Sequence, residues 1–171
     1  MRHDPIDADD LDRLVREHLP AALQFAVRLT GRIESAEDIV QEALLRVARN
    51  YQTFRGDSRF RTWLFQIIIN VFRDQSKRPQ EEPLPPEAVP AVLDFSATSL
   101  LANELRQQIA EHVSRLPPRQ REVLVLTVYE GLSVAETARV LEMSTQNVHA
   151  TLHMARSRLR VELSHLLIEK S

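Results

Sequence analysis

Side chains that can hydrogen-bond to the edges of nucleic-acid bases recur along one helical segment near the C-terminus. Val148 and Leu152 form its apolar stripe, and the residues opposite this stripe are Gln146, Asn147, His149, Ala150 and His153. Asparagine and glutamine amides pair with adenine edges in the major groove. The arginines that follow, Arg156, Arg158 and Arg160, are placed to reach phosphates. The spacing favours a base-reading helix, and a plain helical hairpin that binds nothing would explain it equally well.

The same segment contains a pair of histidines at a spacing that can bind zinc. His149 and His153 are four residues apart, so both lie on one helix face. The helix supplies no Cys, Asp or Glu close to them, and the chain has no cysteine. We therefore interpret both as exposed polar residues facing DNA or solvent, and we predict no metal site and no cofactor.

A second group of residues suited to nucleic acid lies in the first half of the chain. Six of the nine aromatic residues fall between Tyr51 and Phe72, and five arginines lie among or beside them: Arg49, Arg55, Arg59, Arg61 and Arg73. Interleaved aromatic and basic side chains bind single strands by stacking on bases and neutralising phosphates. The same rings would also serve as the core of a small helical domain. We expect both roles, with Trp63 and Phe65 serving partly in packing.

Helices must position the aromatic and basic cluster. Apolar residues recur at helical spacing over residues 11–30, where Pro20 is expected to break or restart the helix and Gly31 to end it. Ser35 and Asp38 resemble a capping pair that opens a second helix. A third helix is expected over residues 59–77. The loop before it, FRGDSRF, offers an N-cap at position 57 or 58.

The second half of the chain also has helical periodicity. One helix is expected over residues 101–115, and Pro118 suits the first turn of the next. Gly131 is expected to close that helix, after which Ser133 and Glu136 form a capping box for a short helix. A tight turn over residues 142–144 then leads into the base-reading helix. Helix, short turn and helix with inward apolar residues is the pattern of a helix-turn-helix.

The two halves are separated by a segment rich in proline and glutamate. Five of the nine prolines fall between Pro79 and Pro90. Proline removes backbone donors, so this segment predicts an extended acidic linker. The predicted fold class is therefore all-α. Two small helical domains, residues 1–77 and 100–171, are joined by a Pro-rich acidic linker over residues 78–99, and the C-terminal domain carries the helix-turn-helix.

Composition excludes several classes of function. The formal net charge of −2 argues against a stand-alone DNA-binding domain, because such domains are usually basic. The longest apolar run, Trp63–Ile69, is interrupted by Gln66 and is too short to span a bilayer, and the polar N-terminus lacks the apolar core of a signal peptide. We therefore expect a cytoplasmic protein without membrane insertion. The chain lacks a glycine-rich phosphate loop and a cysteine nucleophile, so it is not expected to be an enzyme.

Two stretches together resemble one known family. The second conserved region of bacterial RNA polymerase sigma factors is similar to SAEDIVQEALLRVARNYQTFRGDSRFRTWLFQIIINVFRDQSKR, and their fourth is similar to LPPRQREVLVLTVYEGLSVAETARVLEMSTQNVHATLHMARSRLRVEL. The short length resembles the extracytoplasmic-function (ECF) class of the sigma-70 family. The resemblance implies a transcription initiation factor that binds core RNA polymerase and directs it to specific promoters. An anti-sigma factor is a further partner that it implies.

The resemblance also assigns roles to residues. The positions that match the polymerase-docking helix of the family are Glu37, Asp38, Gln41, Glu42, Leu45 and Arg46. Acidic residues there suit a basic protein face and would repel DNA. The positions that match contacts to the −10 element, which the family melts, are Arg55, Asp57, Ser58, Phe60, Arg61, Trp63, Asn70 and Arg73. Those that match contacts to the −35 element are Ser144, Gln146, Asn147, His149, Ala150, His153 and Arg156.

The chain departs from the family pattern inside the predicted reading helix and its turn. His149 and Thr151 stand where ECF factors often carry Lys or Arg, and Glu142 replaces the usual glycine of the turn. These departures argue against strong promoter affinity of the chain on its own. Two alternatives to a sigma factor stay open. One is a helix-turn-helix regulator that acts without polymerase, and the other is a degenerate sigma paralogue that acts as a protein-interaction module.

Overall fold

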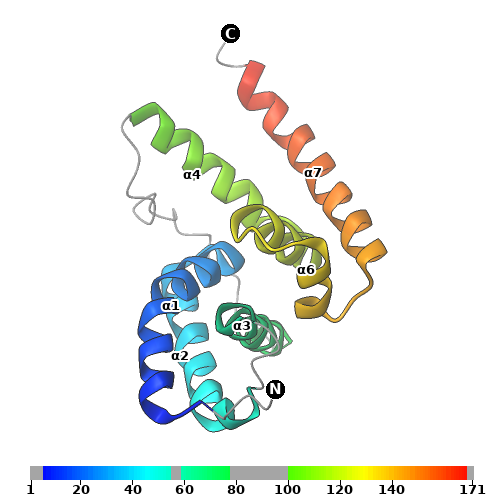
Figure 1. Cartoon of the computed structure of the whole chain (residues 1–171). Helices are drawn as coiled ribbons and strands as arrows, with labels where there is room; N and C mark the ends of the chain where they lie inside the picture. The colour runs from blue at the N-terminus through cyan, green and yellow to red at the C-terminus, as the bar shows by residue number, and fades with distance from the viewer. Residues whose placement is uncertain (1–5, 55–58, 78–99, 169–171) are drawn as a thin grey trace.

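The protein is described by a computed structural model that covers residues 6–54, 59–77 and 100–168 (Figure 1). The described part is all-α, as predicted, and contains no strand. Its elements are α1 (Ala8–Thr30), α2 (Ile33–Asn50), the 3-10 turn η1 (Tyr51–Thr53), α3 (Phe60–Ser76), α4 (Leu100–Ser114), α5 (Pro118–Leu124), the π-helical turn η3 (Val125–Tyr129), α6 (Val134–Leu141) and α7 (Thr145–Ile168). The predicted linker, residues 78–99, lies outside the described residues, so the domain boundaries stay a prediction.

Helices α1, α2 and α3 pack on one another through apolar faces (Figure 1). The rings of Phe25 and Phe65 stack with centroids 4.3 Å apart, and both side chains are fully buried. Ile39 from α2 and Leu64 and Ile68 from α3 are buried in the same core. Burial of each such side chain contributes about 1.5–3 kcal/mol, so packing rather than helix propensity holds these helices together.

Helix α1 runs unbroken through Pro20, so the predicted break there is wrong. A proline inside a helix removes one backbone hydrogen bond. The residues that follow, among them Ala22 and Phe25, are buried, and their packing holds the helix on both sides of the missing bond. The predicted end at Gly31 is confirmed, because this residue adopts φ 72° and its N–H donates to the Val27 carbonyl at 2.8 Å.

The predicted capping pair of Ser35 and Asp38 is also wrong. Helix α2 begins earlier, at Ile33, after an extended Arg32 and without a side-chain cap. The Thr30 hydroxyl accepts from the Arg32 N–H at 3.2 Å and lies 2.8 Å from the Arg32 carbonyl oxygen. These local hydrogen bonds hold a tight connection, so the second helix starts three residues before the capping pattern indicates.

The C-terminal helices begin close to where the sequence places them. The expected helix over residues 101–115 is α4, and Pro118 occupies the first turn of α5. The capping box is confirmed: the Ser133 Oγ accepts from the Glu136 N–H at 3.2 Å, and the Glu136 carboxylate accepts from the Ser133 N–H at 2.9 Å. The π-helical turn η3 was not predicted. It continues α5, and the Glu130 N–H donates to the Val125 carbonyl at 3.0 Å.

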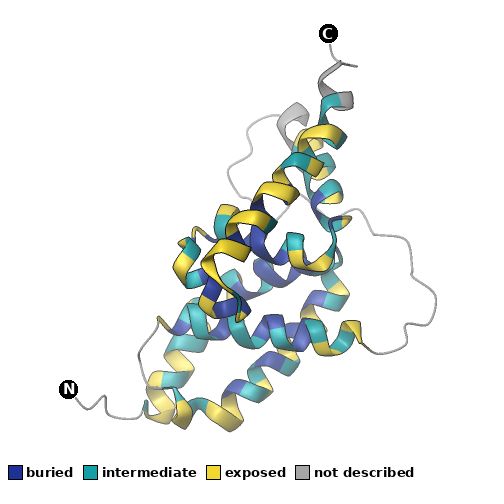
Figure 2. Cartoon of the chain, turned by 90° about the vertical axis from the view of Figure 1, so that its right-hand side faces the viewer, coloured by how far each residue is buried: buried dark blue, intermediate teal, exposed yellow. Residues whose placement is uncertain are grey.

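The N-terminal and C-terminal groups of helices contact each other along a seam. Helix α3 packs against α6, and α1 packs against α4, α5 and η3. Buried segments occur in both groups, with exposed residues toward their outer ends (Figure 2). Gly31 lies on the seam: a Cβ added to it would stand 2.9 Å from the Ser114 Cβ of α4. We use the name seam for all contacts between residues 6–77 and 100–168.

We predict that Gly31→Ala lowers the melting temperature more than Gly131→Ala does. Both glycines have positive φ, 72° and 68°, which costs an L-residue about 1–2 kcal/mol. Only at Gly31 would the new methyl group also collide with another helix, because no atom lies within 4 Å of a Cβ at Gly131. Thermal unfolding followed by circular dichroism would measure this. Equal losses from the two substitutions would contradict the close approach at the seam.

Candidate nucleic-acid interface

Helix α7 packs its apolar face against the rest of the protein and presents the opposite face to solvent. Val148, Leu152 and Ala155 are 0, 8 and 0 % exposed. The Ser144 Oγ accepts from the Asn147 N–H at 3.1 Å and so caps the start of the helix. All residues matched to −35 contacts are solvent-exposed: Ser144, Gln146, Asn147, His149, Ala150, His153 and Arg156. Their accessibility allows contact with a duplex, and their role in reading bases stays a prediction.

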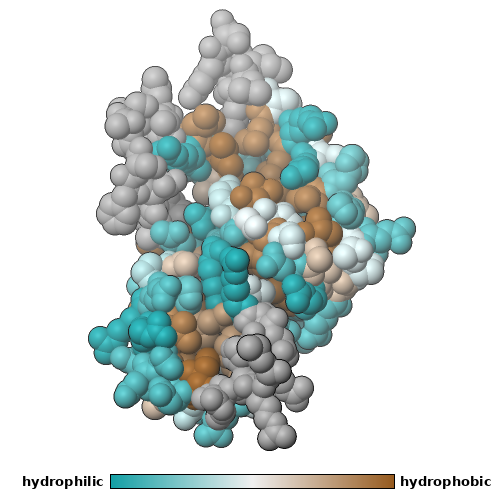
Figure 3. Space-filling model, viewed as in Figure 1, coloured by the Kyte–Doolittle hydropathy of each residue, from teal (hydrophilic) through white to brown (hydrophobic). Residues whose placement is uncertain are grey.

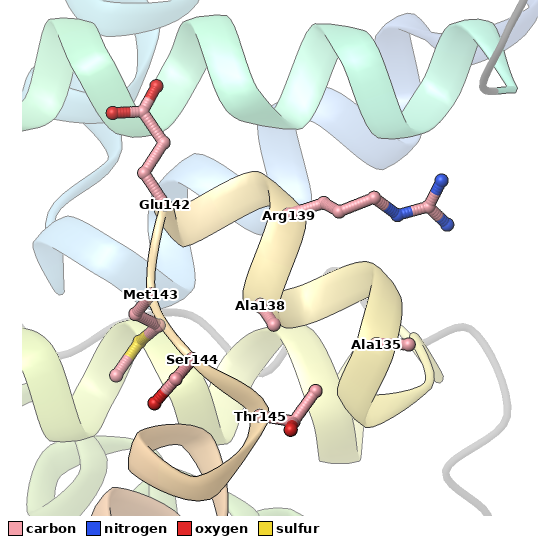
Figure 4. Close-up of a pocket in the computed structure, with 7 residues that line it drawn as sticks. All are labelled: Ala135, Ala138, Arg139, Glu142, Met143, Ser144 and Thr145. Carbon is pink, nitrogen blue, oxygen red and sulfur yellow. The ribbon is translucent and has the colours of Figure 1, made fainter.

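The turn between α6 and α7 contains a left-handed backbone conformation of the kind that glycine usually adopts, but the residue there is not a glycine. Glu142 adopts φ 53° and ψ 50°, and it is the only non-glycine residue with positive φ in the described ranges. The Met143 N–H donates to the Ala138 carbonyl at 3.0 Å, which closes α6. A shallow hollow beside the turn is lined by Ala135, Ala138, Arg139, Glu142, Met143, Ser144 and Thr145. In Figure 4 the Glu142 and Arg139 side chains extend away from each other, so they do not converge on one ligand atom.

We predict that Glu142→Gly raises the free energy of unfolding by up to about 1 kcal/mol, because glycine adopts the left-handed conformation without a Cβ clash. Chemical denaturation monitored by circular dichroism would measure the change. Ala48→Gly, at an exposed position within α2, is the control and should lose about 1 kcal/mol. A loss of stability in Glu142→Gly would show that the side chain compensates for its backbone conformation.

Phe54 and the aromatic residues in the first turn of α3 form a packed cluster. The Trp63 ring lies 5.1 Å from that of Phe54 and 5.7 Å from that of Phe60. Phe60 is 5 % exposed and stacks on His18 of α1, with centroids 5.7 Å apart, whereas Trp63 is half-buried. The expectation that these rings serve in packing is therefore confirmed. Their contact with DNA stays a prediction, and three of the residues expected to join it, Arg55, Asp57 and Ser58, lie outside the described residues.

Two arginines assigned to the −10 element are engaged at the seam. The Arg61 guanidinium donates to the Glu130 carboxylate at 2.5 Å and to its carbonyl at 3.2 Å. The Arg73 Nε and Nη2 donate to the two Glu122 carboxylate oxygens at 3.1 and 2.8 Å. Asn70, half-buried on the same helix, is the remaining −10 residue in the described part. The sequence interpretation missed both glutamates, which nothing in their local pattern distinguishes from ordinary helix residues.

Burial and charge act in opposite directions on the pKa of Glu130 at the seam. Burial raises the pKa of Glu130, and the neighbouring Arg28 and Arg61 limit that rise. Burial also lowers the pKa of Arg121, which donates to the Leu29 carbonyl across the seam. A buried carboxylate that loses its arginine costs about 3–5 kcal/mol. The arginines at the seam are therefore needed for the carboxylates to be buried there.

Helix α2 carries a separate exposed face. Glu37, Asp38 and Gln41 are exposed, and the Leu45 side chain is 48 % exposed one turn further along. Glu42 and Arg46 are half-buried and paired, with 3.0 Å between the Glu42 carboxylate and the Arg46 Nε. The Arg46 Nη1 also lies 3.0 Å from the Asp74 carboxylate of α3.

The hydrogen bonds that Arg46 donates to Glu42 and, with a smaller effect, to Asp74 raise the pKa of Arg46. These contacts fix the α2 face, meaning the exposed surface of Glu37, Asp38, Gln41, Glu42, Leu45 and Arg46, relative to α3. An acidic surface with one exposed leucine suits a basic protein partner.

Other exposed apolar side chains lie outside the predicted interfaces. Those with the largest exposed fractions are Leu105, Val128, Met154 and Val161, which are 42, 52, 51 and 65 % exposed. Apolar patches alternate with hydrophilic ones on the face in Figure 3. Within the described ranges, no three His, Cys, Asp or Glu side chains are placed to hold a metal ion. No described helix combines the length and apolar character needed to cross a membrane.

Comparison with protein families identifies the family to which the chain belongs. Residues 14–81 match the family model of sigma-70 region 2, and residues 106–159 match that of sigma-70 region 4. The chain is 34 % identical to the ECF RNA polymerase sigma factor SigM of Mycobacterium tuberculosis, over 91 % of this chain and 78 % of SigM. It is 29 % identical to the RNA polymerase sigma-H factor of Pseudomonas aeruginosa, over 95 % of this chain and 91 % of that factor. The chain belongs to the ECF class of the sigma-70 family.

Solved structures share the fold. The sigma factor RpoE of Bartonella quintana, in complex with the anti-sigma factor NepR, matches with a TM-score of 0.72 at 22 % identity, over 92 % of this chain and 98 % of RpoE. CnrH, in complex with the cytosolic domain of CnrY, matches with a TM-score of 0.67 at 28 % identity, over 96 % of this chain and 92 % of CnrH. The expected family and all-α fold class are confirmed.

Proposed function

We propose that this sigma factor binds core RNA polymerase through the α2 face and directs it to a specific class of promoters. The observation that carries the proposal is that most residues matched to polymerase docking are exposed on α2, whereas all residues matched to −35 contacts are exposed on α7 or in the turn before it. One chain can then hold polymerase and duplex DNA at the same time. The family models matched at residues 14–81 and 106–159 support this division of roles.

The chemistry of the two faces supports the assignment. Carboxylates of Glu37 and Asp38 would attract a basic surface of the polymerase and repel phosphates, and Leu45 adds apolar contact. On α7, residues 145–155 contain no Lys or Arg, so the helix contributes little phosphate attraction of its own. Polymerase bound to the same DNA would raise the local concentration of α7 at the upstream element.

At the −10 element, the aromatic cluster and the α3 arginines would assist strand opening. An unpaired base gains stacking on aromatic rings, and arginines neutralise the phosphates on either side. Trp63 and Asn70 are both half-buried on α3, so each remains partly accessible. In the family interpretation these residues hold the melted strand, while α7 reads the −35 element as duplex.

We also infer an anti-sigma partner for this chain. RpoE and CnrH are each described in complex with a partner protein, NepR and the cytosolic domain of CnrY. Exposed apolar side chains on the C-terminal helices, such as Leu105 and Val161, offer contact area for such a partner.

The docking assignment predicts that Asp38→Arg weakens binding to core polymerase by about tenfold or more, because it places a like charge against the basic partner face. A pull-down with purified core enzyme would measure this. Glu17→Arg, at an exposed position on α1, changes net charge equally and serves as the control. Unchanged polymerase binding by Asp38→Arg would contradict docking through the α2 face.

The reading assignment predicts that Asn147→Ala relaxes base preference at one −35 position by about 1–3 kcal/mol. Run-off transcription with core polymerase on a set of promoter point variants would measure the preference. Gln107→Ala removes an exposed amide from α4 of the same half of the chain and should leave the profile unchanged. An identical profile for Asn147→Ala and the parent chain would remove Asn147 from the reading residues.

A second candidate function is a protein-interaction module that does not initiate transcription. The observation that favours it is the engagement of Arg61 and Arg73 by carboxylates of the same chain. Run-off transcription with core enzyme on genomic fragments separates the two candidates. Initiation at defined start sites supports the sigma function, and no initiation on any fragment supports the interaction module.

A further inference from the structure

Two histidines and two arginines form one stripe on the exposed side of α7 (Figure 2). His149, His153, Arg156 and Arg160 are four, three and four residues apart, so they follow one another along a single helix face. All four side chains are exposed. With a rise of 1.5 Å per residue, the row is about 16 Å long. We call these four residues the α7 stripe.

The side chains of the α7 stripe are accessible to an external ligand. None of them forms a hydrogen bond or an ion pair with another described residue. Arg158, on the other side of the helix, differs in this respect, because its Nε lies 4.0 Å from the Glu162 carboxylate. Residues 145–155 contain no Lys or Arg, so the first half of the stripe is positively charged only when its histidines are protonated.

The elements around α7 contribute no direct partner to either imidazole. Helices α4, α5 and α6 pack against α7. The charged and titratable residues on these helices, at their ends and on α7 itself are Glu104, Arg106, Glu111, His112, Arg115, Arg119, Arg121, Glu122, Glu136, Arg139, Glu142, Arg156, Arg158, Arg160 and Glu162. None of these side chains is hydrogen-bonded or ion-paired with His149 or His153. His112, for example, has its Nδ1 3.1 Å from the Glu162 carboxylate. Solvent and ligand therefore decide the charge of the two imidazoles.

Protonation changes what an imidazole can bind. A neutral imidazole has one nitrogen that donates and one that accepts, whereas a protonated imidazole donates from both and is positively charged. Histidine makes this change between about pH 5 and pH 8, whereas arginine stays charged. The α7 stripe thus carries two positive charges when both histidines are neutral and four when both are protonated. Protonated histidines attract phosphates and donate to the acceptor atoms of guanine in the major groove.

We propose that α7 takes up protons at His149 and His153 when it binds duplex DNA, so that affinity for the upstream promoter element rises as the pH falls. This inference rests on the proposed function, because it adds regulation by pH to the site where α7 reads the −35 element. The protons come from solvent and stay on the imidazole nitrogens while the duplex is bound. No covalent bond other than these N–H bonds forms or breaks.

The direction of the pH effect follows from electrostatics. Phosphate oxygens close to an imidazole stabilise its protonated form relative to its neutral form. Proton binding and DNA binding therefore favour each other by the same factor. The gain in affinity is complete at a pH where both histidines are already protonated before DNA binds. It is lost as the pH rises beyond the range in which the complex keeps the protons.

The direct test is binding of duplex DNA by the whole 171-residue chain and by the double variant His149→Gln, His153→Gln. The probe is a rhodamine-labelled duplex of mixed sequence, followed by anisotropy at low, constant ionic strength, with EDTA present so that no metal ion bridges the histidines. The parent chain should bind about fivefold or more tightly at about pH 6 than at about pH 8. The double variant should retain a difference of less than about twofold, because glutamine does not titrate. Equal pH dependence in the two proteins would overturn the proposal.

Two further variants separate the α7 histidines from other titrating groups. His18→Gln removes a histidine of α1 that stacks on Phe60, and it should keep the pH dependence of the parent chain. The double variant His149→Lys, His153→Lys carries both charges throughout this pH range, so it should bind at about pH 8 as tightly as the parent chain does at about pH 6. Burial raises the pKa of Glu130, but this residue is the same in all these proteins, so its titration does not affect the comparison. A lysine variant with the pH dependence of the parent chain would contradict the proposal.

The salt dependence of binding reports the number of phosphate contacts and so tests the mechanism. Each contact contributes about 0.9 to the slope of log K against log salt concentration. The slope of the parent chain should therefore be steeper at about pH 6 than at about pH 8, by up to about 1.8 for two added contacts. The glutamine double variant should have the same slope at both pH values. Equal slopes for the parent chain would exclude protonated histidines as phosphate contacts.

Run-off transcription with core polymerase separates this inference from the proposed function. The duplex measurements use no polymerase, so the two can fail independently. Absence of initiation by the parent chain at every pH counts against the proposed function. Initiation with the same pH profile in the parent chain and in the glutamine double variant counts against proton uptake by α7. Initiation that weakens more steeply with rising pH in the parent chain supports both.

Discussion

The pairing of buried carboxylates with arginines across the seam sets the arrangement of the whole chain. Glu122 and Glu130 are too deeply buried to remain charged without Arg28, Arg61 and Arg73. Apolar burial alone would allow the two groups of helices to meet in several ways, because it has no direction. Charged hydrogen bonds require defined donors and acceptors, so they select one arrangement.

This constraint links fold to function through the arginines. The aromatic core of the N-terminal helices places Arg61 and Arg73 on the side of α3 that faces the C-terminal half. The α2 and α7 faces lie away from these pairs and remain exposed. The surfaces proposed for polymerase docking and duplex contact are therefore accessible without a change at the seam, whereas Arg61 and Arg73 are paired there.

Local sequence patterns predicted most local structure. Gly31 and the Ser133–Glu136 capping box were correct because each depends on residues within one turn. The exposed side of α7 followed from helical spacing for the same reason. The misses at Pro20 and at the start of α2 arose where packing or a neighbouring hydroxyl outweighed a local preference. At Pro20 tertiary packing overrode the short motif, and at the start of α2 a competing local hydrogen bond did so.

Local sequence patterns could not predict the ion pairs of the seam. The Arg61–Glu130 and Arg73–Glu122 pairs join residues 69 and 49 positions apart. A glutamate in an amphipathic helix has the same local signature whether it faces solvent or an arginine. The arginines themselves were identified, but as contacts for DNA alone. The net charge of −2 gave no sign that part of the positive charge is paired with carboxylates of the same chain.

Because of the π-helical turn of Val125–Tyr129, the contacts at the seam depend on the number of residues in this turn as well as on charge. Its wider ring, closed by the Glu130 N–H on the Val125 carbonyl, accommodates one residue more than an α-helical turn. In a regular α-helix successive side chains are rotated by about 100°. Loss of one residue from this turn would keep the apolar residues of α5 in place and rotate the following glutamate away from Arg28 and Arg61. A relative that is shorter here by one residue could therefore have all the same charges and yet lack the coupling between its two halves.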